Sequence, residues 1–87
     1  MMCFSNNNPD FYIQTKGMNA GKPLKNPIPN SIGIIADRKK LIPEYLFFVV
    51  HYLHSIDAFK PFINGVAIPF ITHKNISTVI NNHFFKS

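Results

Sequence analysis

The stretch SIGIIADRKKLIPEYLFFVVHYLHSI, residues 31–56, carries the strongest structural patterns of this 87-residue chain. Residues 31–37 are almost all apolar, which predicts a strand covered on both faces, inside a sheet. The charged triplet at 38–40 predicts a turn. Pro43 suits the first turn of a helix and Glu44 complements its N-terminus, so we expect a helix from 44 to about 56. Its apolar residues extend beyond one stripe, so we expect cover on more than one side.

Weaker patterns precede this stretch. Residues 1–9 are rich in asparagine and are expected to form a disordered or irregular lead-in. Residues 10–15 alternate in hydropathy and are rich in β-formers, which predicts a short strand. Residues 16–30 contain two glycines, three prolines and three lysines, a composition that predicts a long, exposed, basic loop without regular structure.

The C-terminal third is less regular. Residues 57–64 are expected to form a turn or a single helical turn interrupted by Pro61. A loop with Gly65 and Pro69 follows, and Thr72 is expected to cap a short helix over 73–79. Residues 83–87 are expected to be a tail. The sequence therefore predicts an α+β fold with a few short strands, one buried helix and one short capped helix.

Composition limits the function classes. Nine lysines and arginines against four acidic residues give a net charge of +5, which favours a polyanionic partner, with an ordinary basic domain as the alternative. A single cysteine, Cys3, cannot form an internal disulfide, and we expect a cytoplasmic protein. The most apolar segment, 45–56, is much shorter than the ~20 residues that span a membrane, so no membrane partner is expected.

Nothing in the sequence predicts catalysis. His51 and His54 lie three residues apart on the expected helix, but no Cys, Asp or Glu at ligand spacing completes a metal site. Every acidic residue lies at the expected boundary of an element, where charge balance explains it: Asp10, Asp37, Glu44 and Asp57. We therefore expect a non-catalytic protein with no metal and no cofactor.

The order of three segments resembles a known family. The segments PNSIGIIAD, LIPEYLFFVVHYL and NGVAIPFITHKNI, separated as they are here, resemble a target recognition domain in the specificity subunit of type I restriction-modification enzymes. The resemblance spans about residues 11–80 and implies sequence-specific binding of double-stranded DNA. It also implies partner subunits for modification (the methyltransferase) and restriction. The further strands and the spacer helix of that family have no counterpart here, so residues 10–82 are interpreted as the C-terminal portion of one such domain, a fragment.

Two loops supply the candidate DNA contacts. In the first, Lys16, Lys22 and Lys25 would neutralise phosphates, and Asn19 has the paired donor and acceptor that suit adenine. Gly17, like Gly21, would let the backbone approach the duplex. The competing interpretation is that these residues simply form solvated turns.

The second loop leads into the expected C-terminal helix. Thr72, His73 and Lys74 lie at its N-terminus, where backbone N–H groups favour an anion, and Asn64 could assist. Capping alone would also explain Thr72. A different class of function is also open, in which the apolar helix at 44–56 docks on a partner protein and the basic loops are incidental.

Overall fold

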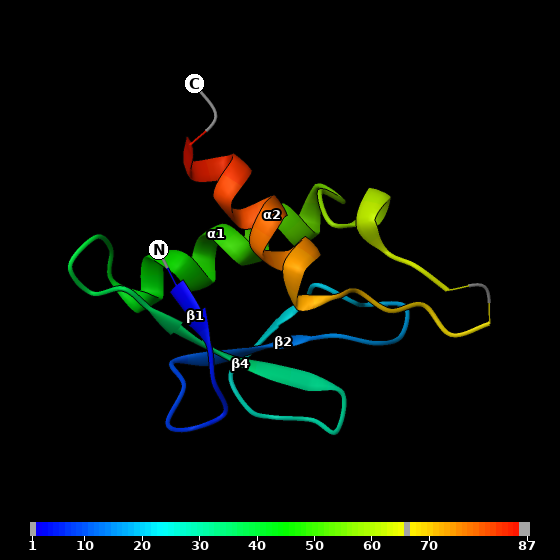
Figure 1. Cartoon of the computed structure of the whole chain (residues 1–87), viewed down its shortest axis with the longest axis horizontal. Coiled ribbons are helices and arrows are strands. Elements are labelled where there is room, and N and C mark those ends of the chain that lie inside the picture. Colours follow the sequence, from blue (N-terminus) through cyan, green and yellow to red (C-terminus); the bar gives the residue numbers. More distant parts are fainter. Residues whose placement is uncertain (1, 66, 86–87) are drawn as a thin grey trace.

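The computed structural model describes residues 2–65 and 67–85 as an α+β domain, in which both helices lie on one side of a single sheet (Figure 1). This confirms the predicted fold class. The elements, in chain order, are β1 (Met2–Phe4), β2 (Phe11–Gln14), β3 (Pro23–Leu24), β4 (Ser31–Ala36), α1 (Pro43–Ser55), the 3₁₀ turn η1 (Lys60–Phe62) and α2 (His73–Phe85).

The sheet is antiparallel throughout, with strand order β1-β4-β2-β3. The apolar strand β4 is interior, as its sequence predicts. It pairs with β2, and the first residue of β2, Phe11, lies opposite Ile34 of β4. Alternation along β2 directs Phe11 and Ile13 into the core, where they are 2% and 0% exposed. The buried side chains of the sheet, α1 and α2 form one continuous core.

Two strands lie where the sequence predicts irregular chain. β1 falls inside the expected lead-in 1–9, and β3 falls inside the expected loop 16–30. β1 pairs with β4, and the turn after it is held by a hydrogen bond from the Gly33 N–H to the Asn6 side-chain oxygen at 2.8 Å. β3 is an edge strand, a position that tolerates Pro23. Both strands form because neighbouring strands offer backbone partners, which local composition does not reveal.

Pro43 lies in the first turn of helix α1, as predicted, and the predicted turns at 38–40 and at η1 are also present. One side of α1 is buried through Leu46, Val49, Val50 and Leu53. Cover on the other sides is only partial: α2 also reaches Tyr45 and Tyr52, whose ring centres each lie 6.2 Å from a ring of its last turns. Four large side chains remain about half exposed or more, at 52%, 70%, 48% and 53%: Tyr45, Phe48, Tyr52 and Ile56. We call these four residues the apolar stripe.

Helix α2 is longer than predicted and runs to Phe85, so it includes residues 83–85 of the expected tail, while 86–87 lie outside the described residues. Its buried residues are Ile76, Val79 and Ile80. The last turn packs on α1, with the Phe84 ring centre 6.2 Å from that of Tyr45. This packing extends the helix, because tertiary contacts outweigh a weak local preference. No helix in the described part of the chain is long and apolar enough to cross a membrane.

Candidate nucleic-acid interface

The two candidate loops, far apart in sequence, are joined by backbone hydrogen bonds. The Gly17 N–H donates to the Pro69 carbonyl at 2.8 Å, and the Ile71 N–H donates to the Thr15 carbonyl at 2.9 Å. Asn64 and Phe70 exchange two hydrogen bonds, of 2.7 and 2.8 Å, and we call the described residues at this bridge, 64–65 and 67–70, the hairpin. The hairpin lies at one end of the molecule in Figure 1, and η1 connects it to the end of α1. We call the surface of residues 15–22, 57–60, 64–65 and 67–74 the basic loop face.

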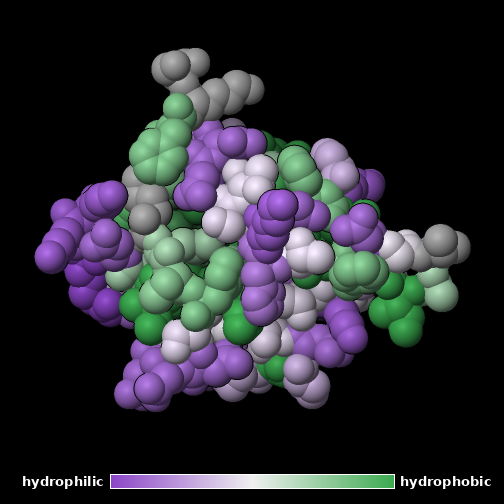
Figure 2. Space-filling view, in the orientation of Figure 1, coloured by the Kyte–Doolittle hydropathy of each residue, from purple (hydrophilic) through white to green (hydrophobic). Residues whose placement is uncertain are grey.

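Most of the excess charge lies on this face. It holds four exposed lysines against one carboxylate, Asp57, for a net charge of +3. The lysines are Lys16, Lys22, Lys60 and Lys74. Ile68 of the hairpin is 66% exposed, and Figure 2 shows hydrophobic atoms at the same end of the molecule as the hairpin in Figure 1. The face therefore combines cations with an exposed apolar side chain.

The opposite end is nearly neutral. Four cations, Lys25, Arg38, Lys39 and Lys40, accompany three carboxylates, Asp10, Asp37 and Glu44, for a net charge of +1. Asp10 forms an ion pair with Arg38 and accepts a hydrogen bond from the Ala36 N–H at 2.8 Å. Charges at this end are thus partly satisfied within the protein.

Most of the candidate DNA-contact residues of the first loop lie on the basic loop face. Lys16, Asn19 and Lys22 are exposed, and the Asn19 carbonyl accepts a turn hydrogen bond from the Lys22 N–H at 2.9 Å. Gly17 joins the two loops through its N–H, as described above. Lys25 is not brought to this face, because its ammonium lies over the Phe47 ring, 5.7 Å from the centroid. The structure therefore separates Lys25 from the other predicted phosphate contacts.

In the second loop, some candidate side chains make contacts within the protein and Lys74 is exposed to solvent. The Thr72 hydroxyl oxygen accepts a hydrogen bond from the Asn75 N–H at 3.2 Å, which confirms its predicted role as a cap. Asn64 donates its side-chain amide to the Phe62 carbonyl at 3.3 Å. The His73 ring stacks on Phe4, with centroids 4.9 Å apart, and is directed toward β1. Lys74 is exposed.

Two glycines on this face are required by the geometry. Gly21 has φ +97°, and a Cβ there would lie 2.8 Å from ring atoms of Phe59, which is 1% exposed. Gly65 has φ +96°, and a Cβ there would lie 2.4 Å from the Ile68 carbonyl oxygen. Side chains are therefore excluded where the first loop meets the turn after α1 and where the hairpin begins.

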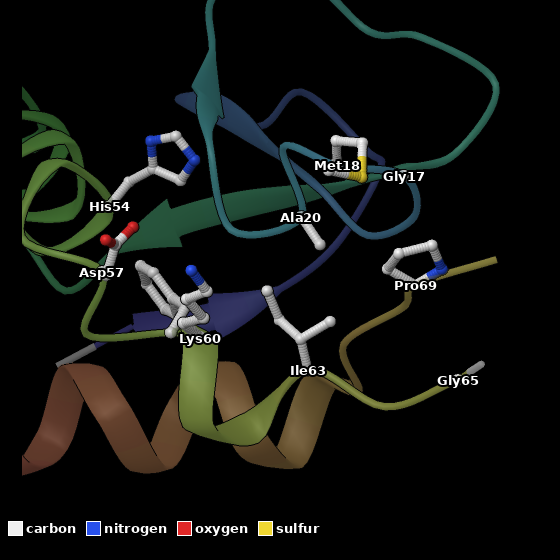
Figure 3. Close-up of a pocket in the computed structure, with 10 residues that line it drawn as sticks. Gly17, Met18, Ala20, His54, Asp57, Lys60, Ile63, Gly65 and Pro69 are labelled. Atoms are coloured by element: carbon white, nitrogen blue, oxygen red, sulfur yellow. The ribbon is translucent and has the colours of Figure 1, made fainter. Parts of the chain in front are cut away.

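A pocket between the two loops involves residues that the sequence did not single out as a site. Its volume is about 350 Å³, and the residues at its walls include Gly17, Met18, His54, Asp57 and Lys60 (Figure 3). His54, Asp57 and Lys60 come from the last turn of α1 and the turn that follows it, and their closeness in sequence was the available signal. Asp57 has φ 60°, a left-handed conformation uncommon for a residue with a side chain.

The pKa of His54 is lowered from its ordinary value. Burial is the largest cause, because it disfavours the charged imidazolium. The positive charge of Lys22 lowers the pKa further, Asp57 raises it, and His51 lowers it slightly. His54 is therefore biased toward its neutral form at neutral pH. In the described residues, no group of three His, Cys, Asp or Glu side chains is arranged to hold a metal ion.

The chain was compared with known proteins. A family model matches residues 4–87, which include all of β2 to α2. The chain belongs to DUF6943, a family of unknown function. No curated protein and no solved structure matches it. The family description assigns no activity, so the basic loop face must be interpreted from its own chemistry.

Proposed function

We propose that this chain is a non-catalytic module that binds double-stranded DNA through the basic loop face. The proposal rests on one observation, the joining of the two basic loops by the Gly17–Pro69 and Ile71–Thr15 hydrogen bonds. These bonds bring Lys16 and Lys74 into one framework, although 58 positions separate them in the sequence numbering (74 less 16). A rigid cationic surface of this kind neutralises phosphates and releases counterions, which dominates the affinity for DNA.

The proposed biological role follows the resemblance to type I specificity subunits. In that role the module, as a fragment of such a subunit, would recognise a DNA sequence and direct methylation and cleavage by its modification and restriction partners. Asn19, exposed beside Lys22, is the candidate for reading a base edge. The non-catalytic assignment is supported by Asp10 and Asp37, which are engaged in structural hydrogen bonds. We place this activity in the cytoplasm, because Cys3 is free and exposed.

The salt dependence of DNA binding tests the proposal. Fluorescence anisotropy with a labelled duplex should give a linear fall of log affinity with log salt concentration. The double variant Lys16→Ala/Lys74→Ala should reduce the slope by about 1.8, because each phosphate contact contributes about 0.9. The matched variant Lys39→Ala/Lys40→Ala removes the same charge at the opposite end and should leave the slope unchanged. Equal slopes in the two variants would refute binding through the basic loop face.

Base reading needs a separate measurement. Selection from a pool of random duplexes should yield an enriched sequence with the wild-type chain. Asn19→Ala should weaken that enrichment at one position and leave the salt slope intact, because a base contact carries sequence information and a phosphate contact does not. An equal loss of affinity for all sequences would show that Asn19 maintains the conformation of the loop and does not read a base.

A second function is favoured by the apolar stripe. Its residues follow steps of three, four and four along α1, the spacing with which one helix face meets another helix. We propose that this face docks on the modification or restriction subunit. Phe48→Glu should abolish co-purification with the modification subunit while DNA binding persists, because Phe48 is 70% exposed and its replacement leaves the core intact. An unchanged complex would exclude the stripe as the docking surface.

A further inference from the structure

We propose that the pocket between the two loops binds an unstacked guanine base. The inference deepens the proposed function and rests on it for the source of the base, a nucleic-acid strand held by the lysines of the basic loop face. The same base chemistry is present in a free guanosine nucleotide, and the experiment below separates the two sources.

The size and walls of the pocket suit a flat heterocycle. Its volume of about 350 Å³ lies near the lower end of the range of about 300–1,000 Å³ for small-molecule pockets. Ile63 and Pro69 supply apolar wall, and Gly17 and Gly65 leave the approach free of side chains. Met18 stands at the first loop beside Gly17 and Pro69 in Figure 3, and its side chain is 88% exposed. A thioether at such a place contacts aromatic rings favourably.

The polar side of the pocket carries opposite charges that do not pair. Asp57 and Lys60 lie close in sequence, yet among the described residues the one salt bridge is Arg38–Asp10. Both side chains instead line the pocket (Figure 3). A ligand that presents hydrogen-bond donors beside an acceptor would satisfy both groups.

Guanine has that arrangement of groups. Its N1–H and N2–H₂ are adjacent donors that a carboxylate can accept together, and its O6 is an acceptor for an ammonium group. Asp57 would therefore accept from N1 and N2, and Lys60 would donate to O6. Adenine and cytosine each offer a different order of donors and acceptors, so this pair of side chains discriminates against them.

A larger pocket lies at the other end of the molecule. It has a volume of about 470 Å³, and its walls include Asp10, Lys25, Arg38 and Phe47. Asp10 and Arg38 already pair there, and Lys25 lies over Phe47. Glu44 also lines this pocket, so two of its charged groups pair with each other, whereas Asp57 and Lys60 of the loop pocket are not paired with one another.

Binding of nucleoside monophosphates, followed by NMR chemical shifts of the intact chain, tests the inference. Guanosine monophosphate should bind at least roughly tenfold more tightly than the adenosine, cytidine and uridine analogues, and should shift the signals of Met18, Asp57 and Lys60. Inosine monophosphate, which lacks the N2 amino group, should bind with intermediate affinity. Equal affinity for all bases, or no binding, would overturn the inference.

Substitutions assign the roles within the pocket. Asp57→Asn should remove the preference for guanine, and the fold should survive because asparagine tolerates the left-handed conformation as well as aspartate does. Asp37→Asn makes the same chemical change far from the pocket and should leave the preference intact. A preference that persists in Asp57→Asn would overturn the assignment of the carboxylate.

DNA probes distinguish this inference from the proposed function. A duplex with one bulged guanine should bind more tightly than a blunt duplex, and Asp57→Asn should abolish that difference while Lys16→Ala/Lys74→Ala weakens both duplexes alike. Binding of both duplexes with equal affinity would overturn the pocket and leave the DNA-binding function standing. Binding of guanosine monophosphate with no binding of either duplex would support the pocket, assign it to a free nucleotide and refute the DNA-binding function.

Discussion

Replacing Gly21 by alanine should destabilise the domain strongly. Two costs combine at this position. Alanine at φ +97° costs about 1–2 kcal/mol because its Cβ crowds the backbone in the left-handed region. The same Cβ would lie 2.8 Å from ring atoms of Phe59, which is buried and cannot turn away, and overpacking of this kind costs about 1–3 kcal/mol.

The expected total loss is about 2–5 kcal/mol, a large part of the roughly 4–13 kcal/mol expected for a domain of 87 residues. Urea unfolding followed by far-ultraviolet circular dichroism measures it. Gly17→Ala is the matched control, because Gly17 has φ +95° but its Cβ would meet only the end of the Gln14 side chain, at 3.2 Å. That variant should lose about 1–2 kcal/mol. Equal losses in the two variants would refute the packing argument for Phe59.

Three further predictions concern α2 and the pocket. Thr72→Ala should lower the free energy of unfolding by about 1 kcal/mol, because it removes the oxygen that caps the Asn75 N–H, and Thr72→Ser should restore it; urea unfolding of both variants checks this. The pKa of His54 is lowered below 6.5 by folding, so the unfolded chain binds more protons below that pH. The contribution of His54 to stability is therefore complete above pH 6.5 and is lost as the pH falls from there through the folded pKa. His54→Gln should flatten this pH dependence of the urea midpoint, and His51→Gln, at an exposed position, should not. In an NMR titration, Lys22→Met should raise the pKa of His54, since it removes the lysine charge that lowers it.

The parts of the fold that sequence patterns predicted are those with a strong local signal. Helix α1 combines a proline at its first turn with apolar residues at helical spacing, and β4 is a continuous apolar run. β1 and β3 are three and two residues long and have no such signal, because they depend on the open edges of β4 and β2. The last turn of α2 depends likewise on the contact between Phe84 and Tyr45.

The same distinction applies to the candidate site. Composition identified the basic loop, including Lys16 and Lys22, because clustered lysines are visible in sequence. It could not place Lys25, whose position depends on the distant Phe47 ring. The pocket was missed as a site because Asp57 was explained as a charge at an element boundary, and its facing partners come from loops that are distant in the chain.

The contribution of α2 to the core has a consequence for how the chain folds during synthesis. Ile76 and Ile80 are fully buried and complete the same cluster that begins with Phe11 in β2. Until α2 has left the ribosome, the sheet and α1 cover each other only in part, and the nascent chain exposes apolar surface that invites aggregation or chaperone binding. Synthesis that pauses before codon 73 should therefore produce a protease-sensitive chain, with protection appearing only once α2 has emerged.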